Sequence, residues 1–227
     1  MQNARKSRQS GSTILEFAVV VPFIIAPLFW GSTAFGIMLG RYVEAVQACR
    51  DITHMLSDGV DFSQTTARNI ALKLTAGTGM TDSGGNGVVI LSKIQTVFQA
   101  DCTATGYTVG QCANANVPVF INRVTIGNAS LRASQYGTPN AAILDTQGNI
   151  SPSVFMQNTD STVRANGFEA DYDAAVLRAL GTAATPPAMN QGDIACVGEV
   201  FFSYPDIGFL GSTTSSGAYK KFIFRCD

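Results

Sequence analysis

Charged side chains and histidine are scarce in this chain of 227 residues. Charged residues make up 14% of it, the net charge is −1, and His54 is the single histidine. Nucleic-acid binding needs a basic patch that this composition does not offer, and a Ser–His or Cys–His catalytic pair has one histidine to draw on. No GxSxG, HExxH or CxxC spacing occurs, so the usual hydrolase, zinc and thioredoxin-like motifs are missing. We therefore expect no nucleic-acid partner, no cofactor, no metal and no enzymatic activity, with distant carboxylates that converge as the remaining catalytic alternative.

Charge is missing altogether between Glu16 and Arg41, a run of 24 residues. As a helix this run is about 36 Å long at ~1.5 Å per residue, enough to cross a ~30 Å hydrocarbon core. Residues 1–15 carry three basic residues and no acid, and basic flanks stay in the cytoplasm. The sequence thus predicts a single membrane span over about 14–40, with the N-terminus in the cytoplasm and the bulk of the chain across the membrane.

Two ordinary interpretations of this segment are a cleaved signal peptide and a plain signal anchor. A signal peptide has an apolar region of ~7–15 residues followed by a small-residue cleavage site, whereas this run is longer and has no clear A-x-A site before Arg41. A plain anchor fits the length, but it gives no reason for Glu16, because a charge at the edge of a lipid-compatible run is costly.

The residues around Glu16 follow a known pattern. Gly11 precedes Ser12, Glu16 is the fifth residue counted from Ser12, and an Ala follows the Glu-Phe pair before Pro22. This resembles the prepilin-peptidase signal of type IV pilins, and in particular the TadE-like family of Flp/Tad pilus assembly proteins. The resemblance covers roughly residues 5–60.

The resemblance implies a leader peptide over residues 1–11 that a prepilin peptidase removes between Gly11 and Ser12. It also implies that Glu16 neutralises the N-terminal amine of a neighbouring subunit in an apolar assembly core. The implied partners are the membrane, the prepilin peptidase, other pilin-like subunits and the pilus assembly platform. The implied location is the bacterial inner membrane with a periplasmic head, and the cell surface after assembly.

The helix is expected to continue to residue 58. Apolar residues recur at three- and four-residue spacing beyond the membrane segment, and Asp58-Gly59 offers a stop signal. The residues on this stripe are Tyr42, Ala45, Val46, Cys49, Ile52, Met55 and Leu56. We predict a helix over 12–58 whose second half packs on a globular head formed by residues 59–227, with Cys49 buried and unpaired.

The head is predicted to combine helices with an antiparallel sheet, a pilin-like α+β fold. A second helix is expected over Ser63–Ala76, and strands over Val88–Gln99 and Val117–Ile126. The loop Asp101–Asn116 joins the two strands and contains Cys102 and Cys112. Disulfides persist outside the cytoplasm, so we predict a Cys102–Cys112 bridge.

The C-terminal segment predicts a β-hairpin and a second disulfide. Apolar side chains alternate along residues 194–204 and 220–226, as expected for strands. In an antiparallel pair the residue numbers of directly opposite partners add up to a constant. Pairing Cys196 directly with Cys226 gives a sum of 422, which places Val200 opposite Phe222. This register predicts a Cys196–Cys226 bridge.

Residues 129–192 read as a polar, loop-rich insertion with one short helix over Phe168–Leu180. Loops of this kind are expected to be exposed and to carry recognition. The three acids near the helix start suit a helix N-terminus, and a calcium site is the alternative.

Taken together, the sequence predicts a TadE-like pseudopilin or minor pilin that takes part in the assembly or the tip of a Flp/Tad-type pilus. The alternative is a membrane-anchored adhesin or envelope binding module that does not polymerise.

Overall fold

The computed structural model describes residues 9–180, 189–204 and 216–226, with side chains for these except at 9–13, 109, 176–180 and 216. The chain divides into two compact units, Met1–Val43 and Glu44–Asp227. The first described element, α1 (Gln9–Ser57), contributes residues to both units. It begins three residues earlier than predicted and ends one residue earlier, before Gly59 with its φ of +84°.

In the first unit the described residues form an uninterrupted part of α1, with Pro22 and Pro27 inside it. Each proline removes one backbone donor from the helix. The hydroxyls of Ser32 and Thr33 donate to the carbonyl oxygen of Phe29 at 2.9 and 2.8 Å. The two hydroxyls thus find their hydrogen-bond acceptor in the backbone of the same helix.

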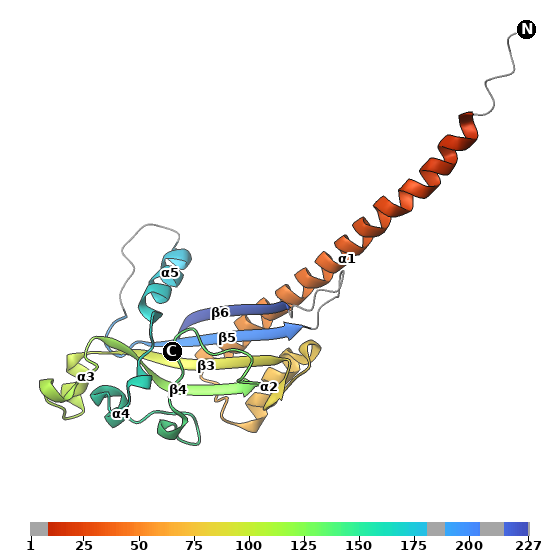
Figure 1. The fold of residues 1–227 in the computed structure, drawn as a ribbon. Helices are drawn as coiled ribbons and strands as arrows, with labels where there is room; N and C mark the ends of the chain where they lie inside the picture. Colours follow the sequence, from red (N-terminus) through yellow and green to blue (C-terminus); the bar gives the residue numbers. More distant parts are fainter. Residues whose placement is uncertain (1–8, 181–188, 205–215, 227) are drawn as a thin grey trace, which may run out of the picture. The chain divides into compact units, whose positions relative to one another are not determined.

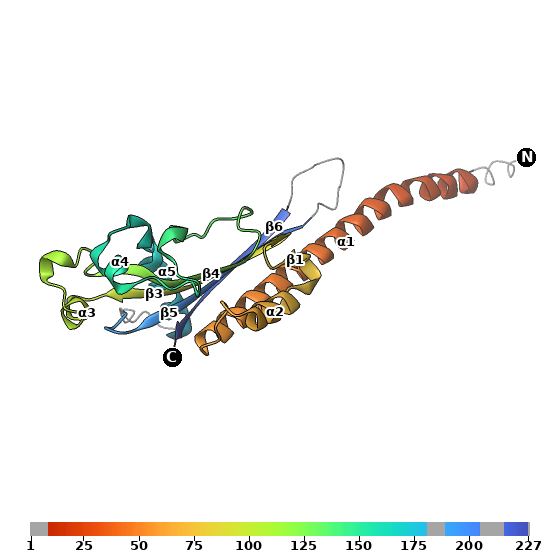
Figure 2. The same cartoon turned by 90° about the horizontal axis from the view of Figure 1, so that it is seen from below.

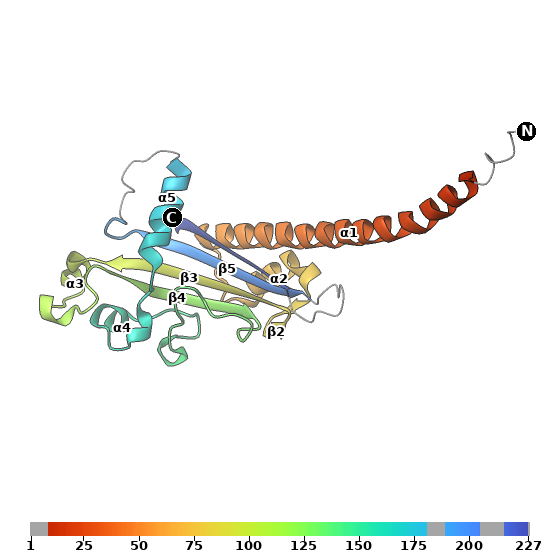
Figure 3. The same ribbon diagram turned by 45° about the horizontal axis from the view of Figure 1, so that its top comes forward.

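The second unit is built on a four-stranded antiparallel sheet in the order β4-β3-β5-β6 (Figures 1 and 3). Its strands are β3 (Gly87–Val97), β4 (Val117–Gly127), β5 (Ile194–Tyr204) and β6 (Ser216–Cys226). The two predicted antiparallel pairs are confirmed. The pairing of β3 with β5, which joins them into one sheet, had no signal in the sequence.

The predicted register of the C-terminal pair is wrong by two residues. Ile194 lies opposite Cys226 and Cys196 lies opposite Phe224, so the constant sum is 420 rather than 422. A slip of two residues keeps every side chain on its predicted face, because side chains alternate with a period of two. The predicted bridge therefore forms between cysteines that are diagonal neighbours.

One face of the sheet packs against the end of α1 and α2 (Thr65–Leu74). Figure 2 shows these two helices on the same side of the strands. The core here includes Cys49, Ile52, Leu91 and Phe202, each at most 1% exposed. The predicted stripe is thus confirmed for its central residues, and α2 is shorter at both ends than predicted.

Helix α1 closely approaches β5 at Gly198. A Cβ atom built on Gly198 would collide with the Thr53 hydroxyl, which itself donates to the carbonyl of Cys49 at 2.5 Å. Glycine in a strand interior marks such close approaches. The second unit therefore holds its part of α1 by direct contact between the helix and the middle of a strand.

The opposite face is covered by the insertion between β4 and β5, including α4 (Pro152–Gln157) and α5 (Phe168–Leu180) (Figure 2). Its core includes Phe120, Tyr136, Val163 and Phe168, all fully buried. The insertion is rich in exposed loop residues, and in addition it covers the sheet with a few buried side chains, which was not predicted. Strand β3 is apolar on both faces, because Val88 to Leu91 are all buried, and both faces must therefore be covered.

Short elements complete the second unit. A small hairpin joins β1 (Met80–Thr81) to β2 (Gly84–Gly85), and α3 (Gln99–Ala104) lies in the segment predicted to be a plain loop. The short helix α3 carries Cys102, which faces the core of the second face. The helix predicted over Phe168–Leu180 is confirmed with the same bounds.

Candidate functional site

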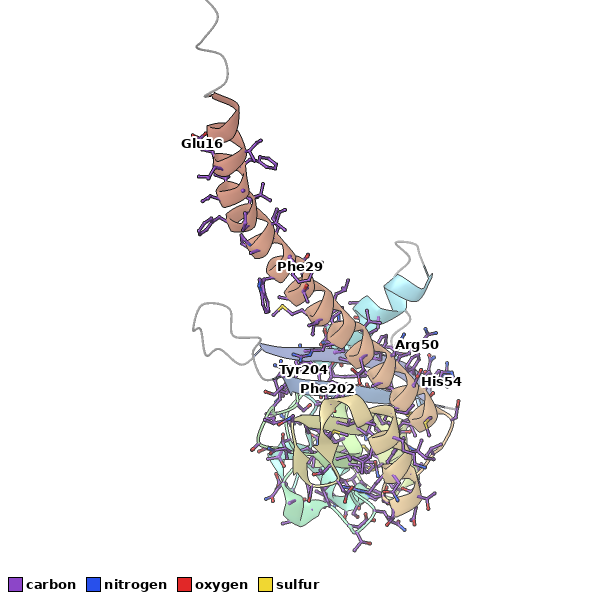
Figure 4. All side chains as sticks on the ribbon, turned by 90° about the vertical axis from the view of Figure 1, so that its right-hand side faces the viewer. Glu16, Phe29, Arg50, His54, Phe202 and Tyr204 are labelled. Carbon is purple, nitrogen blue, oxygen red and sulfur yellow. A yellow bond between two sulfur atoms is a disulfide. The ribbon has the colours of Figure 1, made fainter. Side chains whose placement is uncertain are left out.

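The first unit exposes large apolar side chains on all sides of α1. In Figure 4 the side chains between Glu16 and Phe29 project in every direction from the helix. Apart from the half-buried Val21, large apolar side chains from Ile14 to Val43 are between 42% and 78% exposed. Among the described residues of the second unit, only Ile70 and Leu74 are large apolar residues with comparable exposure, at 39% and 38%. Exposed apolar surface of this extent marks a membrane or assembly contact. The helix is long and apolar enough to cross a membrane, with a mean hydropathy of 2.1 over an 18-residue stretch.

The predicted processing residues lie in the first turns of this helix. Gly11 and Ser12 have helical backbone, and Glu16 follows Ser12 by four residues. Residues four apart lie on the same face of a helix, about one turn from each other. The Glu16 side chain is exposed, so its carboxylate lies on the surface of an otherwise apolar segment.

Both predicted disulfides are present in the second unit. Cys102 and Cys112 are bridged with their Cα atoms 6.1 Å apart, and Cys196 and Cys226 with theirs 5.5 Å apart. The first bridge belongs to the core under the insertion and the second to the core under α1. Each face of the sheet thus has one covalent link of the kind found in proteins outside the cytoplasm.

Cys49 is buried and has no disulfide partner, as predicted. Its Sγ lies 3.4 Å from the carbonyl oxygen of Gly198 and 3.5 Å from that of Lys220. Burial raises the pKa of the Cys49 thiol to about 12. Because the thiolate is the reactive form, this burial and raised pKa are typical of a small core residue.

A buried polar cluster under the insertion was not predicted. The Glu199 carboxylate is 1% exposed and accepts hydrogen bonds from the Ser134 hydroxyl, from the Gln135 backbone N–H at 2.9 Å and from the Tyr219 hydroxyl at 2.7 Å. Arg123 is 5% exposed and donates to the Ser92 hydroxyl at 2.7 Å. The only sequence signal was a charged residue at the centre of each of two apolar strands.

The charges of this cluster influence each other across the sheet. Burial lowers the pKa of Arg123 to about 10, and the negative charge of Glu199 opposes this shift. Burial also raises the pKa of Tyr219, and its hydrogen bond to Glu199 raises it further. Both oxygens of the Glu199 carboxylate have a donor, so the cluster attaches residues 134–136 to the sheet. The Nε of Arg123 and the hydroxyl of Tyr136 are buried there without a hydrogen-bond partner.

Some of the other titratable groups form ion pairs. His54 lies 2.9 Å from Asp58 with its ring edge toward Phe224, and Asp171 of α5 pairs with Lys221 of β6. Glu169 and Asp171 occupy the first turn of α5, where carboxylates favour the helix dipole. Among the described residues, no group of three or more His, Cys, Asp or Glu side chains could hold a metal ion.

The strongest functional feature of the chain is therefore the exposed apolar part of α1 with Glu16 near its start. The head contributes a sheet that is covered on both faces and carries one disulfide on each. Comparison of the chain with protein-family models, with curated proteins and with solved structures finds no match in any of the three.

Proposed function

We propose that this chain is a TadE-like pseudopilin or minor pilin, which is processed after Gly11 and takes part in the assembly or the tip of a Flp/Tad-type pilus. The observation that carries the proposal is a single carboxylate, Glu16, placed four residues after Ser12 on a helix that exposes apolar side chains all round. A plain membrane anchor has no use for this charge, whereas an assembling helix does.

The chemistry of the proposal begins with peptide-bond cleavage. Removal of residues 1–11 frees the α-amine of Ser12, which is largely cationic below a pKa of ~8. An ammonium group and a carboxylate that are buried together lose much less than either would alone. Glu16 of one subunit then pairs with the Ser12 amine of its neighbour, and this pair sets the axial register between helices.

The proposal also assigns a location and partners. The basic residues before Gly11 keep the N-terminus in the cytoplasm of a bacterium, α1 spans the inner membrane, and the head lies in the periplasm before assembly. Two disulfides in the head support an oxidising compartment. The partners are a prepilin peptidase, other pilin-like subunits and the assembly platform in the membrane.

Processing provides the direct experiment. The full chain is co-expressed with a Tad-type prepilin peptidase, and the membrane fraction is analysed by intact mass and N-terminal sequencing. The proposal predicts a product that begins at Ser12. The variant Gly11→Val should remain unprocessed, because a branched side chain replaces glycine at the cleaved bond.

The matched control is Gly31→Val, at a glycine of the same helix where an added Cβ would meet no atom within 4 Å. This control should be processed like the natural chain. A chain that keeps its first eleven residues, or a mature terminus other than Ser12, would contradict the proposal and favour a membrane-anchored module that does not polymerise.

A further inference from the structure

A polar pocket of about 170 Å³ lies in the second unit where three segments meet. Its floor is formed by neighbouring residues of β3 and β4, one wall by the segment after α1, and the other by the loop between Asp145 and Asn149. Half of its ten lining residues carry polar or charged side chains: Asp61, Lys93, Asn122, Gln147 and Asn149. The remainder are glycine or apolar residues: Leu56, Gly59, Val60, Phe62 and Val124.

Lys93 is the unusual member of this lining. It lies in a strand whose preceding residues are all buried, and it is itself only half-buried. The β3–β4 register shifts directly after Lys93, and such bulges commonly re-aim side chains beside binding sites. Within the described part of the chain, the Lys93 ammonium donates no hydrogen bond and forms no ion pair.

The walls of the pocket are held firmly. Asn122 donates from its amide to the Gln147 carbonyl at 3.1 Å and to Asn149 Oδ1 at 2.8 Å. The Arg123 backbone N–H donates to the Gly148 carbonyl at 2.7 Å. Gly148 has a φ of +78°, and a Cβ there would collide with the Arg123 carbonyl oxygen. The loop is thus fixed against the sheet edge before any ligand arrives.

The charges of the pocket balance. Hydrogen bonds from Ser63 lower the pKa of Asp61, and the positive charge of Lys93 lowers it further, although Asp61 and Lys93 do not form an ion pair. An anionic ligand would meet the Asp61 carboxylate, and a cationic ligand would meet the Lys93 ammonium. A neutral ligand that both donates and accepts hydrogen bonds satisfies both groups.

We propose that this pocket binds a single saccharide unit of a glycan. A sugar ring carries several hydroxyls, each a donor and an acceptor, for which the Asp61 carboxylate, the Lys93 ammonium and the Gln147 amide N–H groups are suitable partners. The amide N–H groups of Asn122 and Asn149 are already used within the loop. Its apolar C–H face matches the short apolar part of the lining. The pocket is too small and too enclosed by polar groups to favour a peptide, which needs an extended groove. This site is independent of processing at Gly11 and of polymerisation.

Saturation-transfer NMR on the full chain tests the proposal. The protein is held in phosphocholine micelles, because sugar-based detergents would compete for the site. The probes are the methyl glycosides of glucose, galactose, mannose and N-acetylglucosamine, each in the millimolar range. At least one should receive saturation from the protein, and an excess of the same sugar should displace it.

The decisive variant is Lys93→Met, which removes the ammonium and keeps the length of the side chain. A hydrogen bond from a charged group corresponds to roughly tenfold or more in affinity, so binding should weaken by about that factor. Lys73→Met is the matched control, because Lys73 is an exposed residue of α2 outside the pocket. Its binding should equal that of the natural chain.

Three outcomes would overturn the proposal. These are no saturation transfer to any of the four glycosides, equal binding by Lys93→Met and the natural chain, and displacement of the glycoside by acetate or inorganic phosphate, which would mark an anion site. Near-UV circular dichroism of the Lys93→Met variant must match that of the natural chain. If it does not, Gln147→Glu replaces it, because this change keeps the shape of the side chain, still accepts the hydrogen bond from Asn149 and adds charge to the neutral lining.

Discussion

Helix α1 is one continuous element that meets two different surroundings. From Ile14 to Val43 its large apolar side chains are exposed on every side, whereas from Ala45 to Leu56 they form one stripe that is buried on the sheet. A helix that is apolar all round needs an apolar environment, and a helix with a single stripe needs a single partner. The difference shows that the first part is built for a surface outside the chain and the second part for the chain's own core.

Truncating one isoleucine in each part of α1 should give the largest difference in stability between the two parts. Ile52→Ala removes a fully buried side chain, and such changes cost about 2–5 kcal/mol of unfolding free energy. Ile24→Ala removes a side chain that is 54% exposed and should leave the stability of the head unchanged. Urea unfolding in micelles, followed by near-UV circular dichroism, measures both. Equal losses in the two variants would contradict the distinction.

The next effect concerns the disulfide beneath α1. The double variant Cys196→Ser/Cys226→Ser opens a loop of about 30 residues, and losing such a bridge typically costs ~2–4 kcal/mol. Thermal unfolding should therefore begin at a lower temperature than in the natural chain. Cys49→Ser provides a separate control for changing a buried sulfur without breaking a bridge. Peptide mapping that found a free thiol at Cys196 in the natural chain would contradict this assignment.

The two faces of the sheet can be distinguished by a smaller change at Glu199. Glu199→Gln keeps the shape of the side chain but replaces one acceptor oxygen with a donor, so the hydrogen bonds from Ser134, Gln135 and Tyr219 are no longer all possible. An unsatisfied buried group costs about 1–3 kcal/mol. Hydrogen exchange should increase at residues 134–136 and remain unchanged in residues 45–56. An equal increase in both segments would contradict a local role.

The smallest expected effect is the acid sensitivity of the surface loops. The hydrogen bond from the Asn149 backbone N–H lowers the pKa of Asp145 below its usual 3.8. The folded state therefore holds the charged form more strongly, and this stability is present above about pH 4 and lost as the pH falls below it. In Asp145→Asn the melting temperature should fall less steeply between pH 5 and pH 3. An unchanged slope would contradict the contribution of this loop.

Much of this fold could be predicted because local patterns determine it. Periodicity and composition predict the strands around Val89 and Val200 and the helix Phe168–Leu180. Both disulfides were predicted from the cysteine positions, because alternate residues of a strand share one face. The apolar part of α1 and the stop before Gly59 are likewise local signals. The candidate site of the first unit, Gly11 with Glu16, depends entirely on such short-range spacing.

What could not be predicted depends on contacts between distant residues. The two-residue slip that places Cys196 opposite Phe224 preserves the same alternation, so the sequence pattern cannot distinguish the two registers. The burial of Tyr136 and Phe168 depends on β3 needing cover on its second face. The pocket at Lys93 requires a bulge and two loops that meet only in the folded chain.

The most direct test of the central claim compares two glutamate variants of the chain in a bacterial host that carries a complete Flp/Tad pilus system. Glu16→Ala removes the carboxylate from the exposed apolar helix, and Glu169→Ala removes an exposed carboxylate from the head. Sheared filaments and membranes are separated, and the processed chain is quantified in each fraction. Assembly through Glu16 predicts that Glu16→Ala is cleaved after Gly11 but stays in the membrane, while Glu169→Ala reaches the filaments. Filaments that contain Glu16→Ala at the level of the natural chain would contradict the account.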